Sequence, residues 1–277
     1  MNWKGFAGRL WTRVNDHEIF GRAAQLSYYF LLALFPLLLF LITLLGYLAQ
    51  AGSDLRNELL TYLATVMPSS AVTLVHTTLE EISAARGGGK LSLGILAALW
   101  AASNGMGAIS NTLNAAYGVK EDRPWWKVRL VAIFLTIMVS IFIVLSLAIV
   151  LYGGQIGERV AMHFGFSSGF TIAWKILQWP IALWFLLLTF DLIYYFAPND
   201  RRPKRRVWTA GAATAVVLWL LVSFAFRLYL HFFNSYSVTY GSLGALIVLM
   251  LWFYFTGLAI LVGGEINSEL EQSAARS

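Results

Sequence analysis

Long apolar runs alternate with short polar segments along this chain, and the length of these runs predicts its fold. A bilayer core about 30 Å thick is crossed by roughly 20 apolar residues in an α-helix. Six stretches reach that length: 23–49, 91–117, 130–152, 176–197, 207–231 and 241–264. Lipid offers backbone amides no hydrogen-bond partner, so each stretch must be helical. The pattern predicts an all-α, polytopic membrane protein with six transmembrane helices in a single membrane domain.

The segment 53–86, between the first two runs, is the only long stretch expected outside the membrane. Ser53 and Ser70 are suitable N-caps, and apolar residues follow each of them at helical spacing. Pro68 separates the two amphipathic stretches, and glycines from Gly87 onward end the second. Both are too short or too polar to span, so we predict an external helical hairpin lying over the bundle or on the outer interface.

The two ends of the chain have a different character from the apolar runs. Residues 1–22 form a candidate interfacial helix, with Phe6, Leu10 and Val14 broadly on one side. Residues 265–277 are expected as a cytoplasmic tail.

Composition supports a membrane environment for most of the chain. Hydrophobic residues make up 58% of it and charged residues 12%, with a mean hydropathy of +0.67. An average soluble domain carries roughly 25% charged residues. A soluble protein of 277 residues does not cover its surface with so few charges, so lipid is expected to solvate much of this one.

Basic residues divide unequally between the two sides of a six-helix arrangement. One side holds 14 of them: Lys4, Arg9, Arg13, Arg22, Lys120, Arg123, Lys127, Arg129, Arg201, Arg202, Lys204, Arg205, Arg206 and Arg276. The other side holds 4, namely Arg56, Arg86, Lys90 and Arg159. The positive-inside rule therefore places both termini in the cytoplasm. The excess also favours contact with anionic lipids, and no nucleic-acid partner is needed to explain it.

Asparagines gather in the half of the second run that faces the cytoplasm. Asn104 and Asn111 are seven positions apart and share a helical face, which Asn114 extends. One interpretation is hydrogen bonding between packed helices. The other is a polar stripe that lines a cavity or substrate path, and the sequence leaves both open.

Ionisable residues occur at two depths within the predicted membrane. Asp191 lies about six residues before the cytoplasmic end of its run, and Arg22 lies at a matching depth at the inner mouth of the first. A charge at a helix centre costs roughly 2.5–3.5 kcal/mol on insertion scales, so such groups find partners or carry function. A structural ion pair and a substrate or proton role are both open for Asp191. Glu265 lies at the inner end of the sixth run.

Arg227 lies near the outer end of the fifth run. Its long side chain can reach the outer surface, or it can contact an anion or lipid headgroup near an external opening.

Residues for enzyme chemistry are sparse. The absence of cysteine excludes disulfides and thiol nucleophiles, and the four histidines are far apart in sequence. We therefore expect no catalytic residue, metal or cofactor, and no enzyme activity.

Four stretches carry a family resemblance: AAQLSYYFLLALFPLLLF (23–40), RPWWKVRL (123–130), LIYYFAPN (192–199) and TYGSLGALIVLMLWFYFTGLAILVGGEIN (239–267). In order and spacing they resemble the YihY/BrkB family. The resemblance implies a bacterial inner-membrane protein with six spans and cytoplasmic termini. Names in that family refer to serum resistance and to ribonuclease BN, and lipid export has also been suggested. A metal-dependent nuclease needs clustered histidines and carboxylates, so we treat the ribonuclease name as a mislabel.

The sequence is compatible with three functions. The leading hypothesis is a transporter or flippase-like protein for a lipid or amphipathic envelope component. The second is an ion-coupled small-solute transporter with Asp191 as its coupling carboxylate. The third is a membrane scaffold that transports nothing. Membrane lipids are the expected partners, and the sequence leaves a homo-oligomer and a complex with an envelope protein open.

Overall fold

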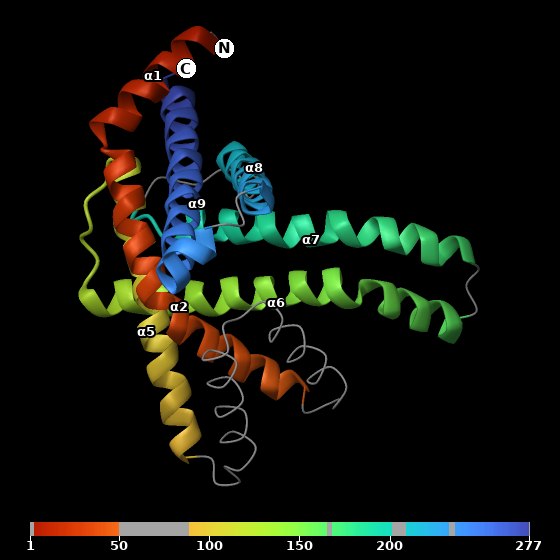
Figure 1. Cartoon of the computed structure of the whole chain (residues 1–277). Helices are drawn as coiled ribbons and strands as arrows, with labels where there is room; N and C mark the ends of the chain where they lie inside the picture. Colours follow the sequence, from red (N-terminus) through yellow and green to blue (C-terminus); the bar gives the residue numbers. More distant parts are fainter. Residues whose placement is uncertain (1–2, 50–88, 165–167, 201–208, 233–235, 277) are drawn as a thin grey trace. The chain divides into compact units, whose positions relative to one another are not determined.

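The computed structural model describes residues 3–49, 89–164, 168–200, 209–232 and 236–276. Helices α1 (Trp3–Asp16), α2 (Ile19–Ala49), α5 (Gly89–Ala116), α6 (Trp125–Phe164), α7 (Ser168–Phe196), α8 (Ala210–Phe232) and α9 (Tyr236–Arg276) occupy most of these ranges (Figure 1). The described residues include no strand, which confirms the all-α class. The hairpin predicted over 53–86 lies outside them.

The chain divides into two compact units, and the division falls inside α2 and α5. One unit comprises residues 1–31 and 105–277, and the other comprises residues 32–104. The described parts of the smaller unit are the apolar remainder of α2 and the first part of α5. In that part of α5, the Ser103 hydroxyl donates to the Trp100 carbonyl at 2.7 Å, which satisfies a polar group inside the helix.

Four described helices have the length and apolar composition to cross a membrane. These are Trp125–Leu151, Gly169–Phe196, Ala210–Tyr229 and Leu246–Ser273, and they correspond to the third to sixth predicted runs. The finding supports a membrane protein, while six spans remain a prediction. The helices that exceed their predicted runs by the widest margin are α6, with 40 residues, and α9, with 41. Each measures roughly 60 Å, about twice the bilayer core, and α9 includes most of the segment expected as a tail.

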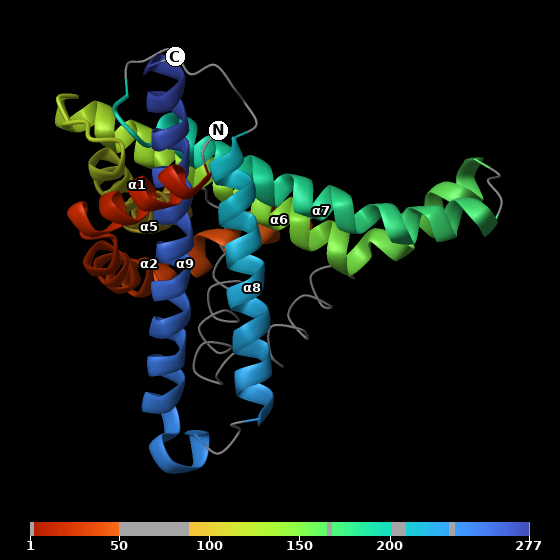
Figure 2. The ribbon, with the colours of Figure 1, turned by 90° about the horizontal axis from the view of Figure 1, so that it is seen from above.

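Helices α6 and α7 run side by side in opposite directions (Figures 1 and 2). Near their connection, the Trp174 indole donates to the Gly153 carbonyl at 2.5 Å and occupies the space where Gly157 lacks a side chain. Lys175 and Glu158 form an exposed ion pair at 3.1 Å. The segment between the third and fourth predicted runs is thus helical over 153–164 and 168–175.

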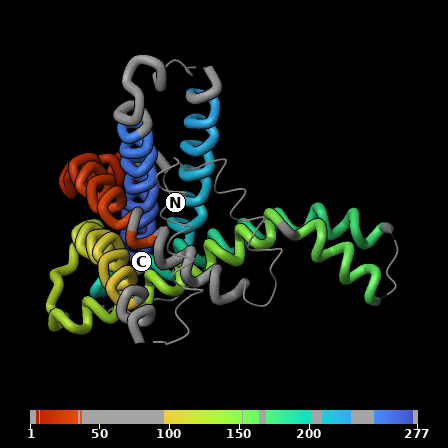
Figure 3. Tube along the Cα trace, turned by 60° about the horizontal axis from the view of Figure 1, so that its bottom comes forward, coloured from red at the N-terminus to blue at the C-terminus, as the bar shows by residue number. Residues whose placement is uncertain are grey.

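Helices α8 and α9 also lie side by side (Figures 2 and 3), and two glycines allow their backbones to meet. A Cβ atom on Gly211 would overlap the Gly263 carbonyl oxygen, and a Cβ on Gly263 would overlap the Tyr194 hydroxyl. The Gly211 amide donates to Asn267 Oδ1 at 2.8 Å, while Tyr194 donates to the Ile260 carbonyl at 2.7 Å. Small residues at a helix crossing permit such polar contacts in a membrane protein.

The N-terminal segment forms two helices, whereas the sequence predicted one interfacial helix over 1–22. The chain turns at Glu18, whose φ of 52° lies in the left-handed region, and α2 begins at the next residue. Phe6 and Val14 of α1 are buried, and α1 packs against α9. The apolar face of α1 is thus covered by protein, while Trp11 on the same helix is 62% exposed.

Candidate functional site

Asp191 is a buried carboxylate near the C-terminal end of α7. Only 7% of the residue is exposed. Its Oδ1 accepts hydrogen bonds from the Thr209 backbone amide at 3.1 Å and from the Thr209 hydroxyl at 2.7 Å. Its Oδ2 is buried and has no hydrogen-bond partner among the described residues. A buried carboxylate oxygen left unsatisfied costs free energy, so this oxygen is available to bind a ligand.

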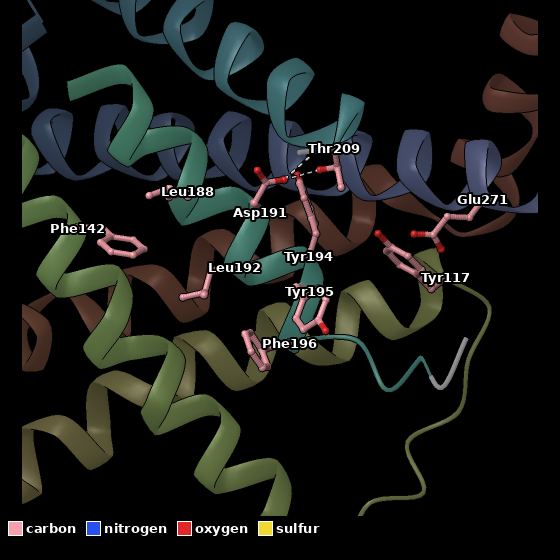
Figure 4. Close-up of a pocket in the computed structure, with 10 residues that line it drawn as sticks. All are labelled: Tyr117, Phe142, Leu188, Asp191, Leu192, Tyr194, Tyr195, Phe196, Thr209 and Glu271. Atoms are coloured by element: carbon pink, nitrogen blue, oxygen red, sulfur yellow. Dashed lines mark hydrogen bonds between the residues drawn. The ribbon is translucent and has the colours of Figure 1, made fainter. Parts of the chain in front are cut away.

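A cavity of about 250 Å³ lies beside Asp191. Its lining comes from α6, α7 and α9, from Tyr117 just after α5 and from Thr209 just before α8, all within the larger unit (Figure 4). The lining residues are Tyr117, Phe142, Leu188, Asp191, Leu192, Tyr194, Tyr195, Phe196, Thr209 and Glu271. Five of these ten are aromatic and two are carboxylates, so the cavity is mostly apolar with acidic groups in its wall.

Thr209 positions Asp191 because it also caps α8. The Ala212 amide donates to Thr209 Oγ1 at 3.2 Å, an N-cap contact that satisfies one of the amides at the helix start. The same hydroxyl donates to Asp191. The carboxylate therefore lies at the N-terminal end of α8, where the helix dipole favours negative charge.

The three predicted asparagines are not brought together at this cavity. Asn104 and Asn111 are exposed, and Asn114 is buried. Asn114 donates to Glu121 Oε2 at 2.9 Å and accepts a hydrogen bond from the Asn199 backbone amide at 2.7 Å. Asn114 thus holds the connection after α5 against the segment after α7, and none of the three lines the cavity at Asp191.

Arg123 reinforces this junction between the two connections. Its guanidinium donates to both oxygens of Glu121, at 2.7 and 2.6 Å, and to the Ala197 carbonyl at 3.0 Å. The Ser110 hydroxyl donates to the same carbonyl at 3.0 Å. The bond from Arg123 holds the pKa of Glu121 below its usual value of 4.5. This cluster keeps the end of α7, and with it Asp191, in place.

The two predicted arginines do not contact Asp191. Arg22 donates through Nε to the His17 carbonyl at 2.8 Å, so the expected ion pair with Asp191 is not found. Asp191 is instead hydrogen-bonded by the backbone amide and the hydroxyl of Thr209. Arg227 is exposed on α8 and does not line the cavity.

Glu265 is fully buried and belongs to a second cluster, which joins α1 to α9. Its carboxylate accepts from Arg13 Nε at 3.0 Å and contacts His17 Nδ1 at 2.5 Å. Arg13 also donates to Glu269 at 3.2 Å, and Arg9 donates to Glu269 at 2.6 Å. Glu265, one of the two candidate inner-mouth residues, is therefore paired with Arg13 and His17.

Sequence reasoning missed this cluster, although a signal for it was present. Arg9, Arg13 and His17 recur at four-residue spacing, as do Glu265 and Glu269. Side chains spaced by four residues share one helix face. Two such faces of opposite charge predict a pair of helices in contact.

The described residues contain no group of three or more His, Cys, Asp or Glu side chains placed to hold a metal ion.

The fold and the cavity together define an α-helical membrane protein with a buried carboxylate in a largely aromatic pocket. The family model described as Virulence factor BrkB matches residues 10–277. The chain therefore belongs to the BrkB family, and the resemblance found in the sequence is confirmed.

Relatives in three organisms cover nearly the whole chain. The ribonuclease-like protein YfkH of Bacillus subtilis is 41% identical over 96% of this chain and 95% of its own length. The UPF0761 membrane protein VP0125 of Vibrio parahaemolyticus is 30% identical over 94% of this chain and 80% of its own. A UPF0761 membrane protein of Aggregatibacter aphrophilus is 25% identical, with coverages of 98% and 94%. No solved structure matches the chain significantly.

Proposed function

We propose that this chain is a transporter or flippase-like protein that moves a lipid or other amphipathic component across the bacterial inner membrane. The observation that carries the proposal is the cavity at Asp191, which combines an aromatic and aliphatic wall with a buried carboxylate oxygen that has no hydrogen-bond partner in the described part of the chain. An amphipathic molecule has both an apolar and a polar part, and this cavity offers a surface to each. The proposed role is transport, and it includes no catalytic step.

The size of the cavity favours one part of such a molecule. Its volume of about 250 Å³ is below the roughly 300–1,000 Å³ of pockets that enclose a whole drug-sized ligand. It therefore suits a headgroup, while longer apolar chains stay in the bilayer. Two of the lining residues on α7, Tyr195 and Phe196, are themselves 47% and 39% exposed, so the aromatic wall of the cavity continues onto the surface of the protein.

The distribution of basic residues suggests on which side the cavity opens. Asp191 precedes the segment 201–206, which holds five of the 14 basic residues assigned to the cytoplasmic side. By the positive-inside rule, the cavity belongs to the cytoplasmic half of the membrane. A headgroup from the inner leaflet is then the first candidate to enter it.

An ion-coupled small-solute transporter is the second candidate function, and the same unpartnered oxygen favours it. A buried carboxylate that lacks a fixed partner can exchange a proton or cation with each side of the membrane. This function predicts uptake that depends on a proton or sodium gradient. Asp191→Asn should remove that dependence, and an unchanged dependence would exclude it.

Lipid movement in proteoliposomes tests the main proposal. Fluorescent phospholipid is followed between leaflets for wild type, Asp191→Asn, Arg227→Ala and the control Glu158→Gln, whose exposed ion pair with Lys175 lies at the far end of α7. We expect wild type and Glu158→Gln to move lipid and Asp191→Asn to lose most of that activity. Arg227→Ala decides whether an exposed arginine outside the cavity contributes.

Wild-type vesicles that match protein-free vesicles would defeat the proposal. A scaffold that transports nothing would then be tested by purification with bound partners. In that case Asn111→Ala should weaken folding or assembly, since the scaffold hypothesis gives the asparagines a purely structural role.

A further inference from the structure

We infer that the cavity at Asp191 binds an ammonium group, either a primary amine or a quaternary ammonium, carried by its ligand. The inference rests on the proposed function in one respect, since it takes this group to be the headgroup of the transported molecule. The site itself is defined by the unpartnered Asp191 Oδ2 and by the charges and rings around it.

The charge of the cavity selects a cation. Two carboxylates, Asp191 and Glu271, are in its wall, and no lysine, arginine or histidine is among the described lining residues. Asp191 Oδ1 already accepts two hydrogen bonds from Thr209, whereas Oδ2 accepts none from any residue that the structure describes. An ammonium group placed there pairs with the charge and satisfies the oxygen at the same time.

The aromatic lining favours an organic cation. Rings of Tyr117, Phe142, Tyr195 and Phe196 come from three different parts of the chain and meet at the cavity. Figure 4 shows Phe142 at one end of this group and Tyr117 with Glu271 at the other. Ring faces attract a desolvated cation within about 6 Å of their centroids. Methylated and primary ammonium groups use such faces and a carboxylate together.

The same lining is poorly suited to a bare metal cation. A hard cation such as Ca²⁺ takes roughly 6–8 oxygen ligands. The described wall offers two carboxylates, the Thr209 hydroxyl already engaged with Asp191, and the hydroxyls of three tyrosines, Tyr117, Tyr194 and Tyr195. The Tyr194 hydroxyl is committed to the Ile260 carbonyl. The remaining surface is aliphatic and aromatic, which suits the carbon atoms of an organic cation.

Binding of choline to the purified full chain tests the inference directly. Isothermal titration calorimetry in maltoside micelles would compare choline with its uncharged isostere, in which a tert-butyl group replaces the trimethylammonium. We expect choline to bind and the isostere to bind at least about tenfold more weakly. Equal binding of the two, or no binding of choline, would overturn the inference.

Variants assign the binding to this cavity. Asp191→Asn should weaken choline binding about tenfold or more, and Phe142→Leu should weaken it while preserving the carboxylate. Glu158→Gln, on an exposed surface, should bind as wild type does. If Asp191→Asn does not fold, as judged by its size-exclusion profile, Phe142→Leu and Glu271→Gln carry the test. Wild-type affinity in every folded cavity variant would place the binding elsewhere.

Dodecyltrimethylammonium distinguishes a lipid-borne ammonium group from a free one. Tighter binding than choline, lost in Asp191→Asn, supports a headgroup with its chain in the bilayer, whereas equal binding supports a free amine. The choline-binding result and the lipid-movement result can fail independently of each other. Lipid movement without choline binding would defeat this inference and leave the proposed function standing, while choline binding without lipid movement would do the reverse.

Discussion

Arg13 of α1 and Glu265 of α9 are 252 positions apart in sequence, yet their side chains meet at 3.0 Å. Glu265 is fully buried, and the Arg13 side chain is 15% exposed. Arg13 also donates to the Ala116 carbonyl at 3.0 Å and to the Ser268 hydroxyl at 2.6 Å. A buried ion pair is costly to separate because the remaining charge stays desolvated. This contact therefore fastens the N-terminal helix to the last helix of the chain.

Replacing Arg13 should destabilise the protein strongly. Arg13→Gln leaves the buried Glu265 with His17 as its nearby partner, and losing one member of a buried pair costs about 3–5 kcal/mol. We expect a lower Tm in detergent and faster proteolysis of α1. Arg9→Gln is the matched control, since Arg9 also contacts Glu269 but its side chain is 49% exposed. Exposed pairs contribute about 0.2–1 kcal/mol, so similar losses for both variants would contradict the buried-pair account.

A methyl group at the α8–α9 crossing should be tolerated poorly. Gly263→Ala places Cβ against the Tyr194 hydroxyl and the Gly211 carbonyl, so the helices must separate. Overpacking of this kind costs about 1–3 kcal/mol, measurable as a lower Tm. Gly21→Ala in α2 is the control, because nothing lies within 4 Å of its added Cβ. That change should be neutral or stabilising, since alanine favours helix over glycine. A stable Gly263→Ala protein would exclude the close crossing.

Thr209 should be replaceable by serine but not by valine. Valine has nearly the shape of threonine, but it removes the hydroxyl that caps α8 and donates to Asp191. Loss of an N-cap costs about 0.5–2 kcal/mol, and Asp191 Oδ1 would lose one of its two donors. We expect Thr209→Val to have a lower Tm than wild type and Thr209→Ser to have a Tm close to that of wild type. Equal Tm values for the two variants would mean that the hydroxyl has no role.

The Glu121 cluster should make stability depend on pH. Its pKa is lowered in the folded protein chiefly by the hydrogen bond from Arg123. A carboxylate with a depressed folded pKa stabilises the protein above the unfolded pKa, and that stability is lost as the pH falls through the folded value. We expect Glu121→Gln to have a lower Tm than wild type at about pH 7, and the difference to disappear as the pH falls through the folded pKa of Glu121. A difference that persists at the acid end would indicate another cause.

The apolar runs predicted the helices well because membrane helices are specified by length and hydropathy alone. The predicted ends of these helices were wrong, because the residue at which a helix ends depends on the helices packed against it. The stretch after 152 contains several glycines and charges and was expected as a loop, yet Trp174 packs into the space at Gly157 and both partners remain helical. Such packing depends on which helices are adjacent, and one sequence does not reveal that.

The candidate site was predicted in part. Asp191 stands out because a carboxylate within an apolar run is rare, and the structure places it in the cavity wall. Its depth suggested Arg22 as a partner, whereas the structure provides Thr209. The sequence indicates how deep a residue lies in the membrane, but its neighbour also depends on which helices are adjacent and how they are rotated. The cluster around Glu265 was missed although the four-residue spacing of its basic and acidic residues indicated two charged helix faces.

The contact of α1 with α9 has a consequence for synthesis. Ribosomes make α1 long before α9, so Arg9 precedes Glu269 by 260 positions and Arg13 precedes Glu265 by 252. Until α9 has been translated and inserted, Arg9 and Arg13 lack Glu265 and Glu269, and the hydrogen bond to the Ala116 carbonyl is the one described side-chain contact that Arg13 can already make. A nascent chain arrested before Glu265 therefore carries α1 without its carboxylate partners, and full docking of that helix has to wait for α9.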